Sequence, residues 1–134
     1  MSPHIHPIAV VAAALSAFLI GGLWYSPLAF ARPWMEDNGF TEASLQARGG
    51  VGRIYVTSLV LLLVASVNLA FFLGGADTTA AWGATAGALA GVWVVAAFGV
   101  TYLFEHKPLR LFLVNAGYHA VAFPLMGLIL GAWR

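Results

Sequence analysis

The sequence predicts an all-α membrane protein in which four transmembrane helices form one bundle. Its 134 residues are 61% hydrophobic and only 8% charged, whereas a soluble domain usually carries about 25% charged residues. A helix needs about 20 consecutive apolar residues to cross a bilayer, and four runs of this kind occur, at about 5–31, 53–74, 79–104 and 108–132. Because these runs take up nearly the whole chain, we expect residues 1–134 to form a single integral membrane domain.

Composition also argues against several classes of function. A net charge of +1 leaves no basic surface for nucleic acid, and the absence of cysteine excludes disulfides and thiolate metal sites. No serine has a histidine and an acid at matching depth, and a metal needs more ligands than His119 and the distant Glu105 supply. We therefore expect no enzymatic activity, no metal and no cofactor. A b-type haem would need His119 from two copies of the chain.

The basic residues predict the orientation in the membrane. One side is expected to carry five of them, Arg32, Arg48, Arg53, Lys107 and Arg110. The other side carries only Arg134. By the positive-inside rule, the connection 32–52 is cytoplasmic and both termini lie outside the cytoplasm, in a plasma (inner) membrane. Ala29-Phe30-Ala31 resembles a signal-peptide cleavage site, but Met1–Pro7 lacks Lys and Arg, so the first segment is expected to be a retained helix.

The first helix, about 5–31, has small residues at every fourth position: Ala9, Ala13, Ala17 and Gly21. This spacing puts them on one face, where another helix can approach closely. Its inner end carries Trp24 and Tyr25, which fit an interfacial aromatic belt or, alternatively, the wall of a binding pocket. Both are expected nearer the inner surface than His119. Pro27 should bend or end the helix, because it cannot donate a backbone hydrogen bond.

The connection 32–52 is expected to contain two short helices. The first opens near Pro33 and ends at Asn38-Gly39. The second runs over 42–48, with Thr41 as its N-cap and Gly49-Gly50 at its end. Apolar side chains among charged ones predict that these helices lie on the inner membrane surface. A solvated linker is the favoured interpretation, and a lid over a cytoplasmic opening is the alternative.

The second and third helices, about 53–74 and 79–104, each carry one polar residue of interest. Asn68 is expected to form a hydrogen bond to a neighbouring helix. Glu105 lies at the negative end of a helix dipole, so it should pair with a cation from the set Lys107, Arg110 and Arg53. A proton carrier is the alternative role for this carboxylate. The third helix also has a glycine ladder, Gly83, Gly87 and Gly91. Such a ladder indicates close helix packing, either within one chain or between copies.

The fourth helix, 108–132, carries the most polar stretch at mid-membrane depth. Asn115, Tyr118 and His119 fall within an arc of about 100° at 100° per residue. A stripe of small residues adjoins this arc: Ala116, Ala120, Gly127 and Gly131. The opposite, lipid-facing side is expected to carry Val114, Val121, Leu125 and Leu128. Pro124 should free the Ala120 carbonyl. Polar groups at this depth are usually paired or functional, and both alternatives remain open for this cluster.

Two parts of the sequence resemble a known family. The first is Gly22-Leu23-Trp24-Tyr25-Ser26-Pro27, followed by Phe30 and Trp34. The second runs from Leu111 through Asn115-Ala116-Gly117-Tyr118-His119 to Met126-Gly127 and Gly131-Ala132-Trp133. They resemble the domain-of-unknown-function family numbered 1761, small four-helix bacterial membrane proteins. The resemblance implies this fold and draws attention to Trp24, Tyr25, Asn115, Tyr118 and His119. It implies no activity.

Two hypotheses of function follow. The first is binding or passage of a small solute, ion or proton at the level of Asn115 and His119, and it predicts a polar cavity that reaches one side of the membrane. A dry, fully bonded cluster would count against it. The second is a non-catalytic structural or partner-binding membrane protein. In both cases the expected partners are the lipid bilayer and a second copy of the chain, joined through glycine-rich faces.

Overall fold

The computed structural model describes residues 3–134, which contain six α-helices and no β-strand. The helices are α1 (Pro7–Trp24), α2 (Ala31–Asn38), α3 (Glu42–Arg48), α4 (Val51–Phe72), α5 (Ala80–Phe104) and α6 (Leu109–Ala132). Four of them, α1, α4, α5 and α6, are long and apolar enough to cross a membrane. The all-α class with four long apolar helices is therefore confirmed. Met1 and Ser2 of the N-terminal arm lie outside the described residues.

The first helix is shorter than the expected 5–31, because the chain leaves the helical path before Pro27. α1 ends at Trp24, and α2 begins only at Ala31. The Leu23 carbonyl, which a residue at position 27 would normally bind, accepts instead from the amide and the hydroxyl of Ser26, at 3.1 and 2.6 Å. Pro27 cannot donate this bond, so a turn replaces the last part of the expected helix.

The two short helices have the ends that the sequence predicts. α2 is followed by Gly39, which has a left-handed φ of 69°. α3 begins after Thr41, whose hydroxyl accepts from the Ser44 amide at 3.0 Å while the Ser44 hydroxyl accepts from the Thr41 amide at 2.9 Å. This reciprocal capping explains why a seven-residue helix forms at all.

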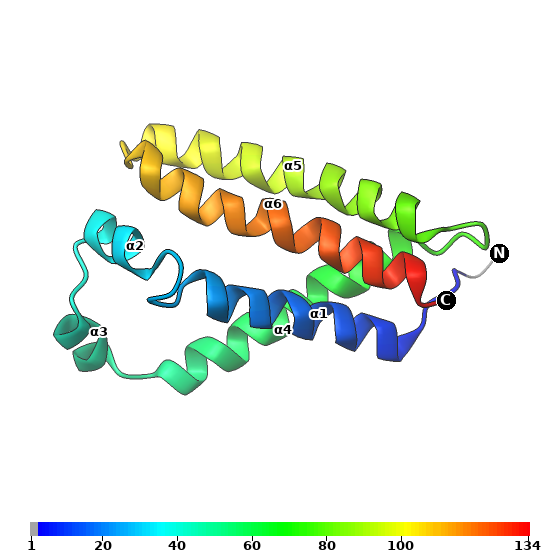
Figure 1. Cartoon of the computed structure of the whole chain (residues 1–134), viewed down its shortest axis with the longest axis horizontal. Coiled ribbons are helices and arrows are strands. Elements are labelled where there is room, and N and C mark those ends of the chain that lie inside the picture. Colours follow the sequence, from blue (N-terminus) through cyan, green and yellow to red (C-terminus); the bar gives the residue numbers. More distant parts are fainter. Residues whose placement is uncertain (1–2) are drawn as a thin grey trace.

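Figure 1 shows α5 and α6 as an antiparallel hairpin, with α1 beside α6 and α4 crossing α1. The short helices α2 and α3 lie at one end of the bundle, and both termini lie at the other. Alanines of α1 and Ala122 and Met126 of α6 are fully buried where the helices meet. Ser66 ties α4 to α1, because its hydroxyl donates to the Val10 carbonyl at 2.8 Å.

The glycine ladder of α5 is used within the chain. A Cβ atom at Gly83 would overlap the Gly127 carbonyl, and one at Gly87 would overlap the Phe123 carbonyl. The backbones of α5 and α6 are therefore in direct contact, as small residues allow in membranes. Of the two uses that the sequence left open for this ladder, packing inside the chain is the one observed, so the ladder is not a free surface for a second copy.

The end of the bundle that carries both termini is closed by polar contacts to the turn between α4 and α5. Arg134 donates to the carbonyls of Leu73 and Gly75. The backbone amide of His4 donates to the Gly74 carbonyl at 2.9 Å. His6 is the N-cap of α1, because its Nδ1 accepts from the Ala9 amide at 3.2 Å. The backbone of His4 and the side chain of His6 therefore help to hold the N-terminal arm and the start of α1 in place.

Replacing Gly87 with alanine is expected to separate α5 from α6 and to cost about 1–3 kcal/mol of stability, the usual penalty for overpacking. Unfolding in mixed micelles, followed by circular dichroism, measures this loss. Gly99→Ala is the matched control on the same helix, because its Cβ would meet only ring atoms of Phe112, at 3.5 and 3.6 Å. Equal losses in the two variants would contradict the close contact.

Candidate functional site

Asn115 lies at the centre of a hydrogen-bonded cluster that joins three helices. The Tyr25 hydroxyl donates to its Oδ1 at 2.8 Å. Its Nδ2 in turn donates to the Tyr102 hydroxyl at 2.7 Å. Tyr25 comes directly after α1, Tyr102 belongs to α5 and Asn115 belongs to α6. Both ends of the amide are therefore bonded inside the chain, and the amide holds together the ends of these helices that lie near α2.

Two further donors fix α1 to α6 through backbone carbonyls. The Trp24 indole donates to the Val114 carbonyl at 2.8 Å, and its ring fills the space next to Gly117. The Tyr118 hydroxyl donates to the Ala17 carbonyl at 2.7 Å. Trp24 and Tyr25 thus meet α6 at the level of residues 114 and 115, one turn before His119. The Tyr25 ring also contacts the Tyr118 ring, with centroids 5.9 Å apart.

His119 differs from its neighbours, because one nitrogen of its imidazole has no partner among residues 3–134. Within residues 3–134, its Nδ1 atom is buried and has no hydrogen-bond partner. Aromatic rings surround it, with centroids at 4.9 Å for Tyr118, 5.1 Å for Phe98 and 6.1 Å for Phe123. Buried polar side-chain atoms nearly always have a partner, so this nitrogen is the exception in the cluster.

The expected faces of the fourth helix are correct only in part. Val121 and Leu128 are exposed on the surface of the bundle, as predicted for lipid contact. Val114 is buried, because the α1 end with Trp24 covers it. Ala120, expected on the small protein-facing stripe, is exposed. The prediction failed at these two positions because α6 is covered by α1 on one side and by α5 on another, which leaves a narrow lipid-facing strip.

Asn68 and Glu105 lie apart from the cluster, and the expected partners of both were wrong. Asn68 is exposed on α4 and donates to the Val64 carbonyl of its own helix at 2.9 Å. Glu105 is exposed after the end of α5. In the part of the chain that the structure describes, Glu105 forms no salt bridge. Arg110, one of its three expected partners, binds Glu36 and Asp37 of α2.

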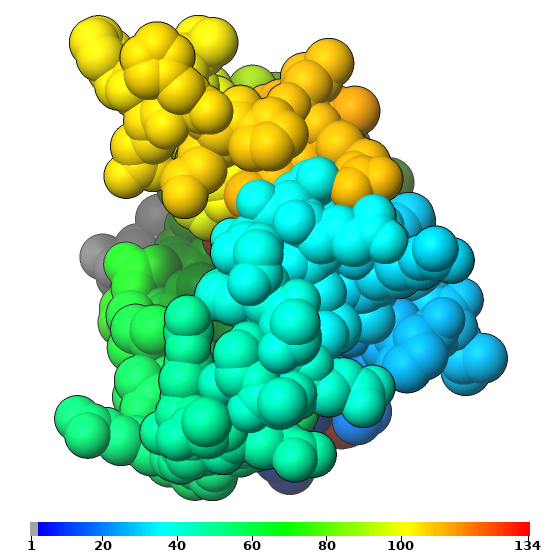
Figure 2. All heavy atoms as spheres, turned by 90° about the vertical axis from the view of Figure 1, so that its left-hand side faces the viewer, coloured from blue at the N-terminus to red at the C-terminus, as the bar shows by residue number. Residues whose placement is uncertain are grey.

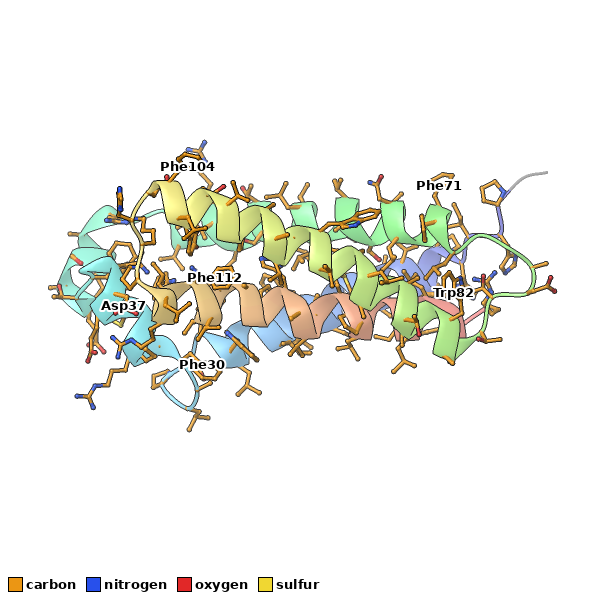
Figure 3. All side chains as sticks on the ribbon, turned by 90° about the horizontal axis from the view of Figure 1, so that it is seen from above. Phe30, Asp37, Phe71, Trp82, Phe104 and Phe112 are labelled. Carbon is orange, nitrogen blue, oxygen red and sulfur yellow. The ribbon has the colours of Figure 1, made fainter. Side chains whose placement is uncertain are left out.

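Arg110 attaches α2 to the beginning of α6. It donates to both carboxylate oxygens of Asp37, at 2.7 and 2.8 Å, and to Glu36 at 3.2 Å. Arg32 also binds Glu36, at 3.0 Å. Hydrogen bonds from Arg32 and then Arg110 lower the pKa of Glu36, and the bond from Arg110 lowers the pKa of Asp37. Figure 3 shows Asp37 at the same end of the bundle as Phe112 of α6.

Neither Tyr102 nor this attachment of α2 was predicted from the sequence. The partners of Arg110 lie 73 and 74 residues earlier in the chain, so spacing within one helix could not indicate them. Tyr102 is 13 residues from Asn115, on the preceding helix. An interior tyrosine near the end of α5 was the available signal, but the pairing depends on how α5 and α6 align.

Neither of two cavities in the described part of the chain is lined by Asn115, Tyr118 or His119. A very small one, of about 10 Å³, lies near the termini beside His6 and Trp133. The other, an open apolar depression of about 340 Å³, lies on the outside of α5 and α6 beside Gly91 and Ala120. No group of three or more possible metal-ligand side chains occurs in residues 3–134.

Comparison with known families gives one match. The family model DUF1761, described as a protein of unknown function, matches residues 8–131, which is nearly the whole chain. The comparisons with curated proteins and with solved structures found no match. The family resemblance seen in the sequence is therefore confirmed, and the family description assigns no activity.

Replacing Asn115 with leucine is expected to destabilise the bundle, because it removes two interhelical hydrogen bonds. Each is expected to contribute about 0.6–2 kcal/mol in a membrane. A double-mutant cycle with Tyr25→Phe, measured by unfolding in mixed micelles, isolates the bond to α1. Asn68→Leu is the control, because that amide bonds only its own helix. The assignment fails if the two leucine variants are equally stable.

Acidification is expected to release α2 from α6. The lowered pKa values of Glu36 and Asp37 mean that their ionised forms stabilise the fold above the unfolded-state pKa, about 4 for these side chains. This contribution is lost as the pH falls through the lowered pKa of the folded protein. Hydrogen-exchange protection of α2 should therefore fall below about pH 4. In Arg110→Gln it should already be low at neutral pH, whereas full protection there would contradict the attachment.

Proposed function

We propose that this chain, which belongs to the DUF1761 family, binds a small hydrogen-bonding molecule at His119 within the membrane. The observation that carries the proposal is the buried Nδ1 of His119, which has no partner in residues 3–134. The neighbouring Tyr118 hydroxyl and Asn115 amide are bonded. An ionisable side chain inside a membrane is a functional candidate by default, and here it is also the one whose bonding capacity is unused.

The surroundings of His119 support binding. A neutral imidazole offers one donor and one acceptor. The bond from Tyr118 to Ala17 fixes one of the rings beside it, and α5 supplies Phe98 on another side. The packed backbones of α5 and α6 hold these rings in place, so little of the entropy cost of binding is spent on ordering them.

Binding is favoured over passage. The Asn115 amide, the Tyr25 hydroxyl and the Tyr118 hydroxyl are all engaged inside the chain, and the two cavities described above lie elsewhere. A polar path to one side of the membrane was the expected sign of passage. We therefore limit the proposal to binding.

A structural role in the membrane is the second candidate. The bridge from Tyr25 through Asn115 to Tyr102 joins α1, α6 and α5 and supports this role. We also propose, from the distribution of basic residues, that α2 and α3 lie in the cytoplasm and that both termini lie outside it. A homo-oligomer would need surfaces other than the glycine ladder, which α6 covers.

Histidine-labelled protein tests the proposal by nitrogen NMR. Delipidated protein in nanodiscs of one synthetic phospholipid is titrated with a total lipid extract from its expression host. The side-chain resonances of His119, assigned with His119→Phe, are expected to shift, whereas those of His4, His6 and His106 should stay unchanged. Unchanged His119 resonances, or equal shifts in all four histidines, would remove the basis for binding at this residue and favour the structural role.

A further inference from the structure

We propose that the molecule bound at His119 is neutral and lipid-soluble, with an oxygen-bearing ring as its head group, and that it arrives sideways from the bilayer between α4 and α5. This inference rests on the proposed function and deepens it. It follows from which sides of His119 are covered by other helices, and from the chemistry of the side chains that surround the imidazole.

The side toward α1 and the inner end are closed by bonded side chains. The bonds of Trp24 and Tyr118 hold α1 against α6. Toward the inner surface, Asn115 is held between two tyrosines. Trp34 of α2 then covers Tyr25, with ring centroids 5.7 Å apart. A solute from the inner aqueous phase would have to displace α2 and break these bonds.

The direction toward the outer end is closed by apolar packing. Ala122 and Met126, which follow His119 along α6, are 0% exposed, and Leu130 is 4% exposed. They belong to one core cluster with Leu69 and Leu73 of α4. The buried hydroxyls of Tyr118 and Ser66 at this core are already bonded, to the Ala17 and Val10 carbonyls, so neither would guide a water-borne solute toward His119.

The side between α4 and α5 is less covered. His119 and Met126 are seven residues apart, so they share one face of α6. α4 covers this face near the outer end, where Met126 and Leu130 are buried. The inner part of α4 is sparsely covered, since Ile54, Tyr55 and Val56 are 59–65% exposed, although the Tyr55 ring contacts Phe18 of α1. Figure 2, viewed from this end, shows a hollow between the yellow end of α5 and the green residues of α4. The lipid phase therefore has the shortest access to His119.

The side chains near the site select a neutral molecule. Within the four long helices, the charged side chains are Arg53 and Arg110, both in the first turns at the inner end. An ion at the depth of His119 would lack a counter-charge, and unpaired charge inside a membrane is costly. The rings of Phe98, Tyr118 and Phe123 suit edge or face contact with another ring. The imidazole then supplies a bond to a carbonyl or hydroxyl oxygen, as in a quinone or a phenol.

The test uses the full chain in nanodiscs, with decylubiquinone and 4-decylphenol as probes. 1-Phenyldecane is the matched control, because it has a ring and the same chain length but no oxygen. Either probe should shift the His119 side-chain resonances, and the control should not. Phe98→Leu should bind about two- to tenfold more weakly, since an aromatic contact contributes about 0.5–1.5 kcal/mol. Circular dichroism checks that this variant remains folded. An unaltered affinity in folded Phe98→Leu would contradict the ring contact.

Access from the bilayer has its own readout. The rate of probe exchange is measured, from the line shapes of the His119 resonances, because affinity at equilibrium does not depend on the route of entry. If the probe arrives through lipid, Trp34→Ala, which removes the cover over Tyr25, should exchange the probe at the unaltered rate. Faster exchange in folded Trp34→Ala would overturn lateral access. A His119 response to the host lipid extract but to neither probe would overturn the ligand class and leave the proposed function intact. No response to the extract or to the probes would overturn both.

Discussion

Inside a bilayer there is no water to bond a polar group, so each one must find its partner within the protein. This constraint explains the polar contacts in the half of the bundle nearer to α2. Trp24 and Tyr118 donate to backbone carbonyls across the interface of α1 and α6, and Asn115 accepts from one tyrosine and donates to another. These hydrogen bonds fix the positions of α1, α5 and α6 relative to one another. Among the described residues, His119 is the side chain of this region whose buried nitrogen has no hydrogen-bond partner. It is therefore the candidate binding residue.

The fold was predictable from the sequence because run length and turn chemistry are local properties. Four apolar runs gave the four long helices, and Thr41 gave the start of α3. The faces of the helices were less predictable. Lipid is as apolar as the protein interior, so a hydrophobic pattern cannot distinguish a valine that faces lipid from one that faces another helix. Val114 shows this, because it is buried under Trp24. The partners of Asn115 and Arg110 depend on the alignment of whole helices, which no local pattern contains.

The bundle has a tightly joined part and a loosely joined part. α5 and α6 meet backbone to backbone through glycines, and α1 is bonded to α6 at several points. α4 is tied to α1 by Ser66 and is packed near the termini, while its other half has few neighbours. A change of shape in this protein would therefore involve α4 more easily than the other long helices, because moving it breaks fewer contacts.

The bonds that Trp24 and Tyr25 make to α6 span 90 residues of sequence. During synthesis at 5–20 residues per second, α1 is therefore made roughly 5–18 s before its partner helix. Throughout that interval its indole and phenol groups stand in or beside the membrane without their final acceptors, whereas α5 and α6 are neighbours in the chain and can pair as soon as both are made. The contact between α1 and α6 can therefore form only at the end of synthesis, after the α6 segment has been translated.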